Sequence, residues 1–179
     1  RDRISSILGL ERSLDGLLSG KSRFTNPSDN FNYIGELNLE GFHLAEEFIG
    51  DMALKTTWDR EKNAVDLKGD LKVDTSTTFI LNGDYFTRDN NLEVDLEFDN
   101  TDVSFLNALM DPDLMNSISG SLDGSVHVKG KWYEPQIKGD LILDDVHVKV
   151  ELLGVEYAID GKIDIDEQLF ALNNICLLY

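Results

Sequence analysis

The chain has 179 residues, which is enough for one domain with a sizeable buried interior. It carries 34 acidic and 16 basic side chains, for a formal net charge of −18. This balance argues against a nucleic-acid-binding surface, which needs clustered Lys and Arg, and against docking on an anionic membrane by charge alone. An excess of acids by itself indicates only a solvated surface.

The cysteine, histidine and apolar content set further limits. Cys176 is the only cysteine, which excludes an internal disulfide and a cysteine-based zinc site. The three His residues have no short ligand spacing, so no metal, cofactor or catalytic residue is predicted. The apolar runs are short, so the sequence predicts neither a transmembrane helix nor a signal peptide. Because the chain starts at Arg1 without Met and ends in an apolar run, we expect a fragment of a longer protein whose membrane anchor lies elsewhere.

The first third mixes helical and extended patterns. Apolar spacings of three and four predict a short amphipathic helix over residues 1–20, although the half from Ser13 onward fits a strand equally well. Residues 21–32 are polar, contain Pro27 and predict a loop. Residues 33–39 alternate as a strand does, and residues 43–50 predict a single helical turn that ends at Gly50.

Period-two alternation then predicts strands over residues 52–58, 65–73, 79–85 and 92–98, with turns at 59–63, 74–76 and 88–91. The clearest is 92–98, where every second residue from Glu93 to Asp99 is acidic. As a calcium or acid–base site this row is weak, because catalytic carboxylate pairs need burial to separate their pKa values. Residues 102–115 break the alternation and predict a short helix with Asp102 as its N-cap.

The chain is organised around residues 117–165, a series of alternating segments punctuated by glycines. We expect successive β-strands with one apolar and one wet face, a break at Asp144–Asp145, and a last strand over 169–178. The glycines predict turns, bulges or close backbone approaches. They lie at positions 120, 124, 130, 139 and 161.

Two sequence blocks recur in the same order and indicate an internal repeat of residues 13–100 and 117–179. Ser-Leu-Asp-Gly occurs at 13–16 and again at 121–124. A second block that contains Gly35 and His43 matches one that contains Gly139 and His147, at an offset of 104 residues. A repeat of strands that each bury one face on their neighbours favours an elongated, solenoid-like sheet.

Residues 117–165 contain an ordered pattern of glycines and apolar residues. It runs Gly120-x-Leu122-x-Gly124, Val126-x-Val128-x-Gly130, Pro135 to Gly139-x-Leu141-x-Leu143, Leu153-Gly154-Val155-x-Tyr157 and Gly161-x-Ile163. This pattern resembles the large C-terminal region of the TamB family of translocation and assembly module subunits. The resemblance extends over residues 117–175 and more weakly over 13–100, and its acidic, Asn-rich character is similar to that of Bacteroidota members.

This resemblance implies a periplasmic protein that runs from the inner to the outer membrane, anchored in the inner membrane by a segment outside this chain. It implies a partner in TamA, a BamA-like outer-membrane barrel, and kinship with AsmA-like and bridge-like lipid-transfer proteins. The implied fold is a long sheet bent into a U around an apolar channel. We therefore expect an all-β fold, an elongated and curved antiparallel-rich sheet with one or two short helices.

Three functional hypotheses follow. The first is a non-enzymatic conduit for phospholipid, or a support for outer-membrane protein assembly, in which acyl chains lie on the apolar face; an ordinary sandwich or barrel core would need the same side chains. The second is a structural scaffold with a self-filled core, or a strand-binding module that pairs partner strands at its exposed edges. Independently of either hypothesis, a segment of a longer sheet is expected to be able to dimerise through its exposed sheet ends. For the first hypothesis, the predicted groove-lining residues are Leu92, Val94, Leu96, Phe98, Leu122, Val126, Val128, Leu141, Leu143, Tyr157 and Ile159.

The third hypothesis, an enzyme, is the weakest of the three. Trp132 and Tyr133 beside Glu134 suggest a sugar-binding aromatic pair, and the many carboxylates suggest a glycosidase. However, the chain has no Ser-His-Asp arrangement, phosphate-binding loop or His/Cys cluster. Trp132 also lies on the apolar parity of its strand, which favours a place in a core.

Overall fold

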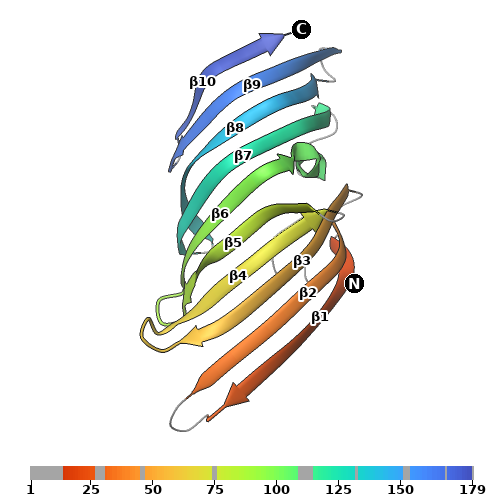
Figure 1. Ribbon diagram of the computed structural model, residues 1–179. Coiled ribbons are helices and arrows are strands. Elements are labelled where there is room, and N and C mark those ends of the chain that lie inside the picture. Colours follow the sequence, from red (N-terminus) through yellow and green to blue (C-terminus); the bar gives the residue numbers. More distant parts are fainter. Residues whose placement is uncertain are drawn as a thin grey trace.

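A computed structural model describes residues 14–26, 31–44, 47–73, 76–108, 115–131, 133–150, 154–167 and 169–178. They form one ten-stranded sheet in which the strands follow each other in chain order and every neighbouring pair is antiparallel. Figure 1 shows the strands stacked from β1 at one end to β10 at the other, in a single curved and open layer. The strands are β1 (Leu14–Thr25), β2 (Asn32–Leu44), β3 (Glu47–Asp59), β4 (Ala64–Val73), β5 (Ser76–Phe86), β6 (Asn91–Asp102), β7 (Met115–Lys131), β8 (Glu134–Val150), β9 (Val155–Asp166) and β10 (Leu169–Leu178).

The all-β, curved and antiparallel fold expected from the alternating sequence is confirmed. Turns between strands use residues that tolerate a left-handed backbone: Asn63 ends the β3–β4 turn and Asn90 ends the β5–β6 turn, with φ angles of 53° and 54°. Asparagine is among the few non-glycine residues that adopt this conformation readily. The predicted turn at 59–63 is therefore present, and the predicted turn at 88–91 is displaced by one residue because Asn91 already begins β6.

A recurring bulge interrupts the alternation near the same end of several strands. Gly41, Asn100 and Asp145 have φ angles of 60°, 43° and 49°, and each lies where the register with the next strand shifts. The backbone N–H of each residue donates a hydrogen bond to an Asp of that next strand. The acceptors are Asp51 at 2.7 Å, Asp123 at 2.7 Å and Asp160 at 2.8 Å.

These bulges keep the apolar side chains on one face. Because a bulge inserts an extra residue, Leu143 and Val146 face the same side although they are three residues apart. The break predicted at Asp144–Asp145 is this bulge, and β8 continues through it.

The one described helix is the 3-10 helix η1 (Val103–Ala108), which follows β6 directly. It confirms the predicted helix in a shorter form, while residues 109–114 lie outside the described part of the chain. η1 rests on the apolar side of the sheet and packs against both β7 and β3, which are four strands apart. No helix among the described residues is long and apolar enough to cross a membrane.

Three expectations for the first half were wrong. Residues 21–25 are not a loop but the end of β1. Of the predicted turn at 74–76, Ser76 lies in β5, and 74–75 lie outside the described residues. Of the predicted helical turn at 43–50, residues 43–44 end β2 and 47–50 begin β3, with His43 paired to Phe48, and 45–46 lie outside the described residues. Bulges at Gly41 and Gly50 disturb the period of two there, and the resulting spacing resembled that of a helix. For residues 1–20, the strand alternative holds from Leu14 onward, and 1–13 lie outside the described residues.

Candidate functional site: the apolar face

One side of the sheet, here called the apolar face, carries apolar side chains on every strand whose side chains are described. Residues opposite each other on neighbouring strands point to the same side, so the registers connect the strands into one surface. The face contains Leu18, Phe24, Leu37, Leu39, Met52, Leu54, Trp58, Val65, Leu67, Leu71, Phe79, Leu81, Tyr85, Leu92, Val94, Leu96, Phe98, Leu122, Val126, Val128, Leu141, Leu143, Tyr157, Ile159 and Ile163.

The structure brings the predicted groove-lining residues together on this face. Val94 on β6 pairs with Val128 on β7, Leu122 pairs with Leu143 on β8, and Val148 on β8 pairs with Tyr157 on β9. Within this set Val94, Leu122 and Val126 are buried and the others are half-buried. Half-burial is what a single layer produces when neighbours on the same face cover the flanks of each side chain but nothing covers its tip.

Among the described residues, η1 is the one segment that packs over the apolar face. Val103 of η1 is 1% exposed and packs with Leu122 and Val146, while Phe105 of η1 packs against a second cluster around Ile49 and Leu71. η1 thus connects the two halves of the sheet across the face. A flat sheet would separate β3 from β7 by about 19 Å, and a six-residue 3-10 helix is roughly 12 Å long, so side chains such as that of Phe105 complete the connection. Figure 1 shows that the sheet itself is bent.

Glycines on the apolar face are consistent with the same bend. A Cβ placed on Gly83, Gly124 or Gly139 would lie 2.2 to 2.3 Å from a carbonyl oxygen of the neighbouring strand. The neighbouring backbone therefore leans over each glycine on this side. A side chain at these positions would meet main chain rather than a movable side chain, so the curvature depends on the absence of a Cβ.

Away from η1, no other described segment covers the face, and several of its side chains are exposed. Leu18 on β1 is 57% exposed and Leu37 on β2 is 42% exposed. At the turn end opposite η1, aromatic rings gather: Phe24 lies 5.0 Å from Tyr33, and Phe31 lies 5.7 Å from Trp58 between ring centroids. Phe24 is 62% exposed, so these rings do not close the face, and its accessible part extends from the aromatic end toward β1.

Several residues of this face did not enter the predicted groove. The buried Leu71 and Ile49, the half-buried Met52 and the η1 residues Val103 and Phe105 all belong to its clusters. The signal for the β3 and β4 residues was present, because apolar and polar residues alternate in these strands too. The covering role of η1 had no such signal, since a bridge between β3 and β7 depends on the curvature of the sheet.

The opposite face is polar and carries cross-strand ion pairs. On β6 and β7, His127 Nδ1 lies 2.7 Å from the carboxylate of Asp95, and Lys129 lies 3.7 Å from that of Glu93. Both pairs are well exposed, so the acidic row of β6 is a solvated strand face rather than a buried acid–base pair. No group of three metal-ligating side chains is gathered anywhere among the described residues. Of the aromatic pair considered for sugar binding, Tyr133 is exposed, while Trp132 lies outside the described residues.

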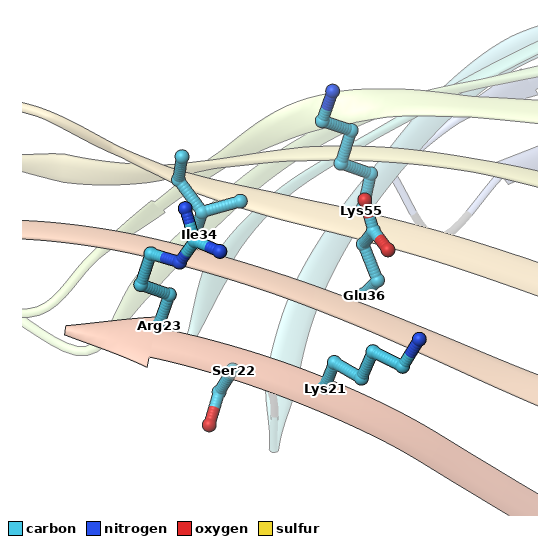
Figure 2. Close-up of a pocket in the computed structure, with 6 residues that line it drawn as sticks. All are labelled: Lys21, Ser22, Arg23, Ile34, Glu36 and Lys55. Carbon is cyan, nitrogen blue, oxygen red and sulfur yellow. The ribbon is translucent and has the colours of Figure 1, made fainter.

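A shallow pocket of about 580 Å³ lies on this polar face over β1, β2 and β3. Figure 2 shows Lys21 and Arg23 of β1 rising on the same side of the sheet as Ile34, Glu36 and Lys55, whereas Ser22 points to the other side. Within the described residues no ion pair joins Lys21, Arg23 or Lys55 to a carboxylate. The pocket is therefore a small positive patch on a strongly acidic chain.

The β8–β9 hairpin contains a titratable contact beside a bulge. His147 Nε2 lies 3.1 Å from Asp145 and Nδ1 lies 3.2 Å from Glu156. Hydrogen bonding to the Asp145 carboxylate, followed by the charge of Asp145 and the contact with Glu156, raises the pKa of His147 above its ordinary value of 6.5. The protonated ring donates to both carboxylates, which is the physical origin of the shift.

We expect the imidazole of His147 to titrate above pH 6.5 in the folded chain. A raised folded-state pKa stabilises the fold below pH 6.5, and this contribution is lost as pH rises through the folded-state value. NMR titration of the ring measures the midpoint, and Asp145→Asn should lower it, because Asn keeps the left-handed backbone but removes the charge. His147→Gln should abolish this part of the pH dependence of unfolding. A midpoint at or below 6.5 would contradict the expectation.

The arrangement thus provides an uncovered apolar surface, a local cover at one end and an ion-paired polar exterior. No protein-family model matches this chain, and neither a curated protein nor a solved structure is significantly similar to it.

Proposed function

We propose that the apolar face binds the hydrocarbon chains of lipids, and that the chain is a non-enzymatic segment of a cell-envelope protein that conducts phospholipid between membranes. One observation carries the proposal: the described strands form a single open layer whose apolar side is continuous from β1 to β9, and among the described residues only η1 packs over it. Water disfavours such a surface at about 25 cal/mol for each Å² exposed, so an apolar guest that covers it is stabilised.

The geometry favours an elongated guest. Nine spacings of about 4.8 Å between ten strands give the sheet a length of roughly 43 Å along its stacking direction. Most described side chains of the face are apolar, and the hydroxyl of the buried Thr56 is already bonded to Gly35 and Tyr33. Acyl chains need no hydrogen-bonding groups, whereas sugars and peptides do. A charged head group would remain in water above the face.

The resemblance of residues 117–175 to the TamB family supports the same proposal. It adds a periplasmic location and a BamA-like outer-membrane barrel, TamA, as the partner. In this proposal a lipid moves by exchanging one set of apolar contacts for the next along the face, and no residue performs covalent chemistry. η1 would narrow the path where it crosses from β7 to β3.

Two adjacent residues of β8 give a matched test. Leu141 belongs to the apolar face, and its neighbour Ile142 is 50% exposed on the opposite face. We expect native mass spectrometry of the purified wild-type chain to detect bound phospholipid, confirmed by lipid extraction from the same sample. Leu141→Asp should lose this lipid, because it places a charge on the binding surface, and Ile142→Asp should retain it.

A second pair lies away from η1, where the face is uncovered. Leu81→Asp and Ile80→Asp alter the apolar and the polar side of β5 in the same way. Circular dichroism of all four variants separates lost binding from lost folding. A folded, lipid-free wild-type chain would contradict the proposal, and so would equal lipid loss in both members of each pair.

A further inference from the structure

The outer edge of β1, which is the edge that faces away from β2, has features that suit pairing with a further strand. Within the described residues β1 pairs only with β2, so the main-chain groups of its other edge have no strand partner. Such an edge is a template for an incoming strand, and its side chains decide which strands it accepts. The interior strands show how pairing is specified in this sheet.

At three interior edges the same contact fixes the register. A left-handed residue on one strand, namely Gly41, Asn100 or Asp145, donates its N–H to an Asp on the strand that follows. The acceptor always comes from β3, β7 or β9, and it lies opposite the bulge of the strand before it. An Asp at this position therefore marks a strand that pairs with a bulged strand.

Asp15 is in the position of such an acceptor on β1. Asp160 and Asp15 are each followed by a glycine in a related backbone conformation, Gly161 with φ 154° and Gly16 with φ 148°. Gly16 of β1 lies opposite the register shift of β2, and Gly161 of β9 lies opposite the register shift of β10. Asp160 accepts the N–H of Asp145 from the strand before it. Asp15 is exposed, and within the described part of the chain its carboxylate accepts the N–H of its own neighbour Gly16, at 3.0 Å, and no other.

The charges on the same edge indicate what the incoming strand carries. Lys129 lies six residues after Asp123 on β7, and Lys21 lies six residues after Asp15 on β1. On β7 this lysine meets Glu93, its cross-strand neighbour on β6, at 3.7 Å. Lys21 has no ion-pair partner among the described residues, and Arg23 beside it has none there either. A lysine on a sheet edge often prevents pairing, but on β7 the equivalent lysine lies inside a formed pair.

We propose that the outer edge of β1 binds an antiparallel strand that resembles β6. In the bound strand, a residue with a left-handed backbone donates its N–H to the Asp15 carboxylate. An acidic residue seven positions earlier in that strand forms an ion pair with Lys21. Among the described residues three strands make this bulge contact, and only β6 has the pattern, with Glu93 seven residues before Asn100; β2 has Ile34 and β8 has Lys138 at that position. The partner is thus an acidic strand rather than any extended peptide. This surface is independent of the apolar face.

The test measures binding of a fluorescently labelled peptide with the sequence of residues 91–102 to the full chain by fluorescence anisotropy. We expect saturable binding that weakens by at least about tenfold in Asp15→Ala, since a hydrogen bond to a charged group is lost. Lys21→Glu should weaken it as well, and addition of salt should reduce the contribution of Lys21. Asp89→Ala, an exposed Asp in the β5–β6 turn, is the matched control and should bind as the wild type does.

Peptide variants test the other side of the contact. Asn100→Val in the peptide should weaken binding, because a β-branched residue does not adopt a left-handed backbone, and Glu93→Lys should weaken it to wild-type protein but restore it to Lys21→Glu. Equal binding of all peptides, or wild-type binding by Asp15→Ala, would overturn the proposal. It would also be overturned if sedimentation showed that Asp15→Ala abolishes only self-association of the chain, since the occupant would then be a second copy.

Discussion

Gly139→Ala is expected to lower the free energy of unfolding by about 3 kcal/mol, at the upper end of the usual cost of overpacking. The added Cβ would lie 2.2 Å from the carbonyl oxygen of Ser125 and 2.8 Å from Cα of Val126. Both atoms belong to the backbone of β7, so neither can rotate away. Relief requires β7 and β8 to separate, and these are the two longest strands of the sheet.

Urea denaturation followed by circular dichroism measures this effect, and Gly69→Ala is the control. Gly69 also lies on the apolar face, but a Cβ there would be 3.2 Å from the nearest backbone oxygen, that of Ala53. A small backbone adjustment accommodates that distance, so we expect Gly69→Ala to be much milder. If both variants unfold at the same urea concentration as the wild type, the close approach at Gly139 is not a constraint on the fold.

Val103→Asp is expected to be similarly severe, because it places a carboxylate in the best-covered part of the chain. Val103 is 1% exposed and contacts Leu122 and Val146, and its surroundings offer apolar side chains from β7 and β8. Burial of an unpaired charge costs several kcal/mol, or about 3 kcal/mol if η1 detaches to leave the charge in water. Ser104→Asp, at the next and half-buried position, is the matched control and should cost far less.

Hydrogen exchange distinguishes a general loss of stability from the loss of the η1 contact. If η1 holds the curved sheet from β7 across to β3, its release should increase exchange in β3 as well as in β7, although these strands are not neighbours. Increased exchange in β7 alone would contradict this coupling. The comparison therefore tests whether a six-residue helix stabilises distant strands.

The fold could be predicted from the sequence because apolar and polar residues alternate strictly in its strands. Residues 92–98 are apolar at every second position, and β6 forms there with both faces as expected. The pattern failed where bulges altered it: Gly41 and Gly50 made the β2–β3 hairpin resemble a helical turn. A bulge changes the period for one residue only, and a helix can produce the same local spacing.

The apolar face was predictable in composition but not in shape. Leu141 and Val126 could be assigned to one face from their parity, and the registers place them there. Whether that face was closed by a second layer could not be read from the sequence, because a core and an open surface use the same side chains. The cover by η1 and the acceptor role of Asp123 depend on strand register, which is fixed by pairings between distant residues.

The strictly sequential order of the strands has a consequence for growth of the sheet by evolution. Each strand pairs only with the strands before and after it in the chain, so no connection passes over another strand. Two-strand units can then be inserted or deleted without rethreading the remainder, provided that the new junction again joins a bulged strand to a strand with the matching carboxylate. The length of the sheet is thus a variable that duplication can adjust, while the Asp-to-bulge contact preserves the joint between units.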